Sequence, residues 1–294
     1  MPENGFEFSF ACWPMPNPSS VGLPNPSSYT DLGDGTVRDN VTGLLWQKAI
    51  DVATQKLPWD AAKNYCATLT LAGRKWHLPT RIELLSIVDF TRVGPAIDTK
   101  AFPGVPGGAY HWTSSPWVVS EISTKPQYSW IVNFYEGLTS NAGVRDAAEF
   151  TRCAASSQQG AMPEHYTLLG GGEIRDNATG LTWVQQTSPE THSPSDALAY
   201  CQNLSLNGHA FRLPSIKELS TLVDENPPIK AVSPAIDKTA FPDTKANGWY
   251  ISSSHWAGPA DKSSSLAWAI NYEDGFTDPG YGDHFTVGWV RCVR

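Results

Sequence analysis

Four carboxylates lie close together near the end of the chain. Glu273, Asp274, Asp278 and Asp283 all fall within residues 271–284. Carboxylate oxygens accept hydrogen bonds from sugar hydroxyls, pair with basic groups of a partner, and are the ligands that Ca²⁺ prefers. The cluster therefore predicts a ligand-binding loop. A metal site and a solvated acidic loop are the alternatives.

Aromatic side chains could supply contact area for the same ligand. Trp and Tyr rings are large and rigid, and they stack on sugar rings or on a protein partner. The candidates for this role, together with one histidine beside the acidic cluster, are Trp117, Tyr135, Trp256, Tyr272, Tyr281 and His284.

Three aspartates near the start of the chain also have a spacing that suits oxygen ligands. Asp31, Asp34 and Asp39 could hold Ca²⁺, but a hydrogen-bonded turn uses the same residue types. We expect the turn. No cofactor is expected for the chain, and Ca²⁺ is the one ion for which candidate ligands exist.

Four of the five cysteines come in matched positions. Cys66 and Cys201 each follow a tyrosine in a predicted helix, and Cys153 and Cys292 each follow an arginine near the end of a repeat. We expect disulfides Cys66–Cys153 and Cys201–Cys292. A zinc site lacks its CxxC spacing, and buried free thiols remain the alternative. Disulfides imply export to an oxidising compartment. Cys12 has no counterpart and is either free or linked to another chain.

The histidines do not form a catalytic constellation that recurs along the chain. His111 and His255 both lie near Ser-Ser turns, yet they do not align with each other. Nucleophilic catalysis needs a base held beside a nucleophile. We therefore expect a binding protein and not an enzyme.

The chain repeats one sequence pattern twice. Residues 38–44 read Arg-Asp-Asn-Val-Thr-Gly-Leu, and residues 175–181 read Arg-Asp-Asn-Ala-Thr-Gly-Leu. Ordered matches continue to the end of each copy, through Trp46 with Trp183, Leu78-Pro79 with Leu213-Pro214, Pro95–Asp98 with Pro234–Asp237, Ala101–Pro103 with Ala240–Pro242, and Trp130 with Trp268. Self-similarity of this kind predicts two domains, residues 29–155 and 164–294, after an extended segment of residues 1–28.

Each copy predicts the same series of elements. Two short strands flank an Asn- and Gly-containing turn, and a helix with an apolar stripe follows at about residues 59–71 and again after Pro194. A second helix at residues 81–89 and 216–224 starts with a capping box, in which Thr or Ser precedes Glu by three residues. Short strands and long loops complete each copy. The fold class is therefore α+β, with two helices beside a small antiparallel sheet in each domain.

The leading segment has its own pattern. Residues 5–11 alternate apolar and polar side chains as a strand does, and a proline-rich stretch follows. Such a strand could add to the sheet edge of a neighbouring molecule, with Cys12 locking the contact.

Charge excludes one class of partner. The chain has a net charge of -8 and a pI of about 5.3, and the acidic excess lies in the second copy. A nucleic-acid binder normally presents a basic stripe to phosphate, so none is expected here. No run of apolar residues is long enough to span a membrane, and no signal peptide is visible at the start.

The matched motifs resemble a known bacterial family. The run Asp34–Trp46, the Tyr-Cys helix, Trp76–Thr80, Trp112–Ser115 and Val290–Val293 are similar to the Lcl C-terminal domain, named for a collagen-like adhesin. The resemblance covers both copies and implies a fold like that of C-type lectins and formylglycine-generating enzymes. It also implies an extracellular or cell-surface adhesin, or a periplasmic one, that binds a glycan or a protein.

This chain departs from the sulfated-glycan binders of that family. It has no basic cluster beyond Arg74-Lys75, and the collagen-like repeat is missing. Three alternatives to the adhesin therefore remain. They are a structural subunit assembled through residues 1–28, a binding protein diversified by a retroelement over residues 254–289, and an enzyme of the formylglycine-generating type.

Overall fold

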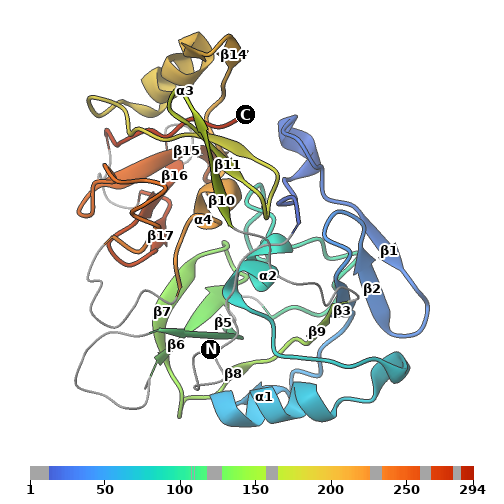
Figure 1. The fold of residues 1–294 in the computed structure, drawn as a ribbon. Helices are drawn as coiled ribbons and strands as arrows, with labels where there is room; N and C mark the ends of the chain where they lie inside the picture. The colour runs from blue at the N-terminus through green and yellow to red at the C-terminus, as the bar shows by residue number, and fades with distance from the viewer. Residues whose placement is uncertain are drawn as a thin grey trace.

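The computed structural model describes residues 13–106, 108, 110–117, 128–156, 165–225, 234–258, 266–280 and 286–294. The two sequence copies form two halves, one above the other in Figure 1. Each half combines short helices with small, mostly antiparallel sheets, so the predicted α+β class with tandem domains is confirmed.

The first half contains two sheets and two α-helices. One sheet has the order β1-β2-β3-β9, and the other has the order β4-β8-β5-β6-β7, with β5 and β8 parallel. The elements are β1 (Tyr29–Asp31), β2 (Thr36–Asp39), β3 (Leu45–Gln47), β4 (Lys56–Leu57), α1 (Trp59–Thr68), α2 (Arg81–Ser86), β5 (Tyr110–Trp117), β6 (Tyr128–Asn133), β7 (Thr139–Val144), β8 (Glu149–Phe150) and β9 (Ala154–Ala155).

The second half repeats this plan with smaller sheets. Its strands pair as β10-β11-β12, β13-β14 and β15-β16-β17. The elements are β10 (Tyr166–Gly170), β11 (Glu173–Asp176), β12 (Thr182–Val184), α3 (Pro194–Asn203), β13 (Ser205–Leu206), β14 (His209–Ala210), α4 (Ile216–Ser220), β15 (Trp249–His255), β16 (Ala267–Asn271) and β17 (Thr277–Asp278).

Both predicted capping boxes form. The Thr80 hydroxyl accepts from the backbone N–H of Glu83, and Ser215 accepts from that of Glu218. The two helices are shorter than predicted, because the chain soon turns back and bonds to a later loop. The N–H groups of Asp89 and Asp224 donate to the carbonyls of Ala96 and Ala235.

Both predicted disulfides are present. Cys66 on α1 is bonded to Cys153, and Cys201 on α3 is bonded to Cys292, with Cα atoms 5.4 and 5.5 Å apart. All four residues are buried. Each bond therefore ties the first helix of a half to its last segment, inside the core.

The two halves pack through matched residues. The hydroxyls of Thr139 and Thr277, which occupy the same position in the two copies, lie 2.9 Å apart. The ring of Phe90 meets that of Trp268 edge-on at 4.9 Å, and α2 lies against α4 in the middle of the molecule (Figure 1). A self-complementary contact of this kind has the form of a two-fold dimer interface.

A buried ion pair crosses the same boundary. Arg81 Nε lies 2.5 Å from a carboxylate oxygen of Glu225, and Arg81 Nη2 donates to the carbonyl of Ser220 at 2.9 Å. Both side chains are almost fully buried. Removing one partner would leave the other charged and unpaired in the interior, which is far more costly than losing an exposed pair.

Two matched glycines pack closely against a valine of their own half, and Gly275 also lies next to the other half. Gly137 and Gly275 both have positive φ, at 96° and 79°. A Cβ on Gly275 would lie 2.6 Å from Val223 and 3.4 Å from Trp130 of the other half. The turn that follows β16 is thus packed into the interface.

The segment before the first repeat folds onto the second half. Met15 is fully buried, the Pro16 carbonyl accepts from Lys217 Nζ at 2.9 Å, and Asn17 donates to Glu218 at 3.3 Å. The sequence indicated only an extended, proline-rich segment here, so its packing on the second half is a finding of the structure. The predicted strand at residues 5–11 and Cys12 lie outside the described residues.

The disulfides predict a large loss of stability on removal. We expect Cys201→Ala with Cys292→Ala to lower the free energy of unfolding by about 4 kcal/mol, because the unfolded chain gains the entropy of an open loop. Urea unfolding of the variant and the wild type measures this. Peptide mapping without reductant should recover both pairs, and four free thiols in native material would contradict the bonding and the argument for export.

Lys217 predicts a pH dependence. Its burial lowers the pKa of the ammonium group to about 8 from the ordinary value of 10.5, and the nearby carboxylates of Asp89 and Asp39 oppose this effect in part. The folded state therefore loses this proton before the unfolded state does. Burial of the charged ammonium group therefore destabilises the folded state. This destabilisation is at its full size below pH 8 and disappears as the pH rises toward 10.5.

We expect the stability of the wild type, relative to Lys217→Met, to rise by about 2 kcal/mol between pH 7.5 and pH 9.5. Urea unfolding at the two pH values measures the difference. Lys100→Met removes a charge at an exposed position and is the matched control. If the stability difference between the wild type and Lys217→Met stays constant or falls as the pH rises, the ammonium group of Lys217 does not have a lowered pKa in the folded protein.

Candidate functional site

The predicted acidic cluster begins in the turn between β16 and β17, which holds Glu273 and Asp274, and continues through Asp278 at the end of β17. Two of its carboxylates bond to nearby backbone, since Asp274 accepts from the N–H of Phe276 at 3.0 Å and Asp278 from that of Gly280 at 2.6 Å. Glu273 is exposed. Tyr281, Asp283 and His284 lie outside the described residues.

Two of the predicted ligand-binding aromatics are core residues. Tyr272 is fully buried and donates to the carbonyl of Leu219 at 2.9 Å, and burial raises the pKa of its phenol. Trp256 is only 6 % exposed, with its indole N–H 3.3 Å from Glu136 of the other half. Both were expected to contact a ligand, and the structure corrects this: Trp256 is covered by the other half, and Tyr272 packs on Leu219 and Tyr250 within its own half. The matched residue of Tyr272 is Phe134, and this apolar counterpart was a signal for burial.

The other two predicted aromatics reach the surface of the first half. Tyr135 is 46 % exposed. Trp117 is half-buried, and its ring meets that of Tyr128 edge-on at 5.7 Å. Both remain candidates for contact with a partner.

The three early aspartates serve turns, as expected. Asp34 accepts from the hydroxyl of Thr36 at 2.5 Å, which lowers its pKa, and Asp31 accepts from Lys48 Nζ, which lowers its pKa also. Asp39 is buried, and that burial raises its pKa. Within the described parts of the chain, no three acidic, histidine or cysteine side chains converge as metal ligands do.

The end of β15 is bordered by two hollows. The first, of about 470 Å³, lies where the leading segment, the first half and β15 meet. Its lining is Pro18, Val21, Leu23, Phe90, Thr91 and Ser253–Ala257. The second, of about 460 Å³, lies toward α3 and is lined by Pro194, Ser195, Leu198, Leu213, Ser252, Ser253, His255 and Ala267. We call the two together the β15 groove.

A bulge at the end of β15 shapes this groove. The pairing of β15 with β16 shifts register between Ile251 and His255. Three serines hold the bulge in place: Ser252 donates to Trp268, the N–H of Ser253 donates to Pro214, and Ser254 accepts from the N–H of Ile216. Bulges re-aim side chains next to binding sites. Here Ser253 and His255 line both hollows.

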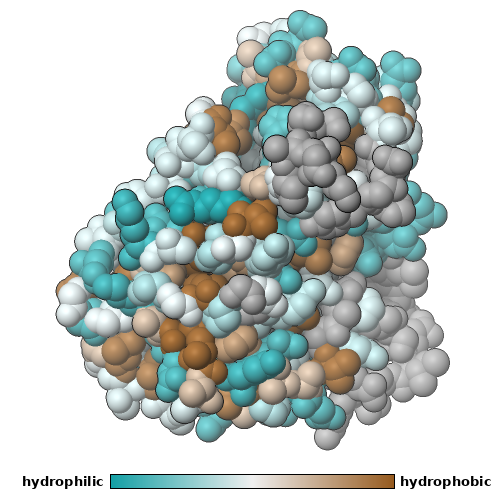
Figure 2. All heavy atoms as spheres, turned by 180° about the vertical axis from the view of Figure 1, so that it is seen from behind, coloured by the Kyte–Doolittle hydropathy of each residue, from teal (hydrophilic) through white to brown (hydrophobic). Residues whose placement is uncertain are grey.

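The chemistry of the groove is neutral. None of the described residues lining it is acidic, and His255 is its only basic side chain. Apolar surface combines with the hydroxyls of Thr91, Ser195 and Ser253. Figure 2 shows apolar side chains in small groups among polar ones on the rear face of the molecule. A concave apolar surface with a few polar groups is typical of a ligand site.

The model of the Lcl C-terminal domain matches residues 35–155 and again residues 172–294. The chain belongs to the Lcl C-terminal domain family. Both matched stretches lie within the two domains expected from the repeats, and the suspected tandem arrangement is confirmed. No curated protein matches the chain.

Family membership indicates an adhesin-like surface protein. Two disulfides fit an extracellular location. Among the helices that the structure describes, none has the length and apolar character needed to cross a membrane.

The sequence of this Lcl C-terminal domain pair carries no pattern that predicts the β15 groove. There, His255 was a candidate only for catalysis, and Trp256 was expected only as an exposed aromatic. Val21 and Leu23 carry no binding signal, and their position beside Phe90 depends on how the leading segment folds back. The Ser-rich run before His255 is the one local feature that pointed to a bulge at the end of β15. The matched Ser-rich run in β5 also has a shift in register.

Proposed function

We propose that this protein is an exported bacterial surface protein that binds a neutral glycan or an uncharged protein segment in the β15 groove. The observation that carries the proposal is that two adjoining hollows share Ser253 and His255. Fold membership alone would not suffice, because one fold hosts many functions.

The composition of the groove supports a glycan. Sugar rings have apolar faces that pack on side chains such as Val21, Leu23 and Leu198. Their hydroxyls hydrogen-bond with Ser, Thr and His side chains, which both donate and accept. A sulfated ligand would gain little here, since a sulfate is best met by a cluster of Arg or Lys. We therefore place this protein apart from binders of sulfated polysaccharides.

Binding is proposed in preference to catalysis. The groove offers one imidazole, and the nearest described hydroxyls are engaged with the backbone: Ser253 donates to Pro214 at 3.2 Å and Ser254 accepts from Ile216 at 3.1 Å. Nucleophilic catalysis would need a hydroxyl activated by a base.

A second candidate function is a structural subunit of a surface assembly. Residues 13–17 are anchored at the junction of the two halves through Met15 and the Pro16 carbonyl. Residues 1–12 therefore start from a fixed base, from which a strand could pair with a neighbouring molecule.

The groove predicts where binding is lost. We expect Val21→Asp with His255→Ala to weaken binding of neutral oligosaccharides at least about tenfold, since a buried charge and a lost polar partner each oppose the complex. A glycan array identifies the oligosaccharide, and calorimetry gives the affinity. Both positions are at the surface, so the melting temperature should change by no more than a few degrees.

The matched control lies in the acidic loop. Asp274→Ala with Tyr281→Ala removes two of the residues first expected to bind, and this pair should bind as the wild type does. If the loop pair loses affinity and the groove pair keeps it, the site is the acidic loop. Failure of the wild type to bind any array member or cell-surface protein would reject the binding function.

Assembly is tested by a deletion limited to residues 1–12. We expect the shortened chain to fold and, if the wild type is oligomeric, to be monomeric in light scattering. Removing residues 1–28 is unsuitable, because Met15 and Asn17 are part of the core. An unchanged particle mass after the short deletion would exclude assembly through this segment.

A further inference from the structure

The two halves differ in the residue that begins their first helix. Trp59 begins α1 and Pro194 begins α3, and the Tyr-Cys pair shared by the two helices aligns these positions. Trp59 is only 5 % exposed. Its indole N–H donates to the carbonyl of Thr113 at 2.8 Å, and its ring belongs to the same buried cluster as Leu78. In the first half, a large aromatic side chain therefore fills the space between α1 and β5.

The second half has a hollow where the first half holds this ring. The hollow of about 460 Å³ toward α3 has Pro194, Leu213 and Ser252 in its lining. The last two occupy the positions of Leu78 and Thr113, which lie around the ring in the first half. Since a proline side chain is much smaller than an indole, the space remains open.

The wall of the hollow keeps the hydrogen bonds of its counterpart. The Ser252 hydroxyl donates to the carbonyl of Trp268 at 2.7 Å, and the Thr113 hydroxyl donates to that of Trp130 at 2.7 Å. In both halves the N–H of the following serine donates to a matched proline, at 2.8 and 2.7 Å. The backbone of the two walls therefore follows the same course. The Ser252 carbonyl lies where its counterpart accepts the indole N–H.

The cations around the ring are replaced by apolar surface at the hollow. In the first half, the Lys63 ammonium group lies 4.5 Å and the Arg145 guanidinium 3.7 Å from the centre of the Trp59 ring system. Leu198 takes the position of Lys63, lines the hollow and is 43 % exposed. No carboxylate, lysine or arginine is among the described residues that line the hollow. This lining suits an uncharged ring, which gains by covering exposed apolar surface.

We propose that the hollow toward α3 binds a tryptophan side chain of a partner polypeptide, which takes the place that Trp59 has in the first half. Its indole N–H would donate to the Ser252 carbonyl, and its ring would lie against Leu198 and Leu213. This assignment rests on the proposed function, which places the ligand in the β15 groove. The comparison of the two copies favours the uncharged protein segment over the glycan, because the first half already holds an amino-acid side chain at this position.

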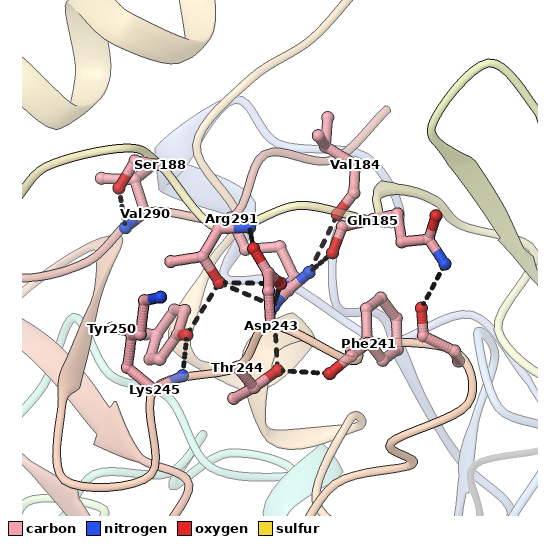
Figure 3. A network of polar contacts seen from close by, with 12 residues as sticks. Val184, Gln185, Ser188, Phe241, Asp243, Thr244, Lys245, Tyr250, Val290 and Arg291 are labelled. Atoms are coloured by element: carbon pink, nitrogen blue, oxygen red, sulfur yellow. Dashed lines mark hydrogen bonds and ion pairs between the residues drawn. The ribbon is translucent and has the colours of Figure 1, made fainter.

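The second half is held together by contacts that do not involve the residue at position 194. The disulfide Cys201–Cys292 ties α3 to the last segment of the chain, and Arg291 is fully buried in a polar network (Figure 3). Its Nη2 group donates to the hydroxyls of Thr187 and Thr244, both at 3.0 Å. Substitution of Pro194 should therefore leave the fold intact.

The probe is N-acetyl-5-fluorotryptophanamide, an uncharged mimic of a tryptophan residue within a peptide. Fluorine NMR measures its binding to the full-length protein, and we expect a Kd of about 0.1–1 mM for a compound of this size. Pro194→Trp should weaken binding at least about tenfold, because the new side chain would occupy the hollow as Trp59 occupies its own site. Pro194→Ala leaves the hollow open and is the matched control, which should bind as the wild type does.

Trp59→Ala gives an independent test in the first half. Removal of the indole should open a corresponding hollow there, so the probe should raise the melting temperature of this variant more than that of the wild type. If Trp59→Ala does not fold, the two Pro194 variants carry the test.

Equal binding of the probe by Pro194→Trp and the wild type would overturn the assignment. A wild type that binds a neutral oligosaccharide and not the probe would also overturn it, while leaving the proposed function in place. Conversely, probe binding that is lost in Pro194→Trp would support the tryptophan site even if no array member or cell-surface protein binds, a result that rejects the proposed function alone.

Discussion

Thr139 and Thr277 hold the same position in two copies of one domain, and their hydroxyls lie 2.9 Å apart. This contact joins matched residues of the two halves at the centre of their interface. Around it, α2 meets α4, and Phe90 packs on Trp268. One hydrophobic core therefore runs through both halves and includes Met15 of the leading segment. The protein behaves structurally as a dimer whose subunits are covalently joined.

The packing of the two halves covers some surfaces of each half and leaves others exposed. The turn after β16 was expected to face a ligand, yet its Gly275 lies against Trp130 of the other half. The same docking brings Phe90 and the leading segment beside the end of β15 and so completes a hollow that neither half has alone. The other hollow of the β15 groove is lined by residues of the second half alone. Duplication followed by docking has thus enlarged a groove that the second half begins.

The two copies differ in the partners of their buried charged side chains. Arg152 and Arg291 are kept, together with the phenylalanines that face them, but the polar partners remain only in the second half. Glu225 stands where the first copy has Phe90, and it pairs with Arg81 across the boundary.

The sequence alone determined the duplication, the α+β class, the capping boxes and both disulfides, because each depends on local patterns or on residues matched between copies. It could not show that Trp256 lies beside Glu136 or that Val21 lies beside His255. Those facts depend on contacts between segments more than a hundred residues apart, for which a single sequence holds no periodic signal. Only the tertiary structure placed the leading segment on α4 and joined the halves into one core, because the energy of that packing is a property of two surfaces together and not of either sequence pattern.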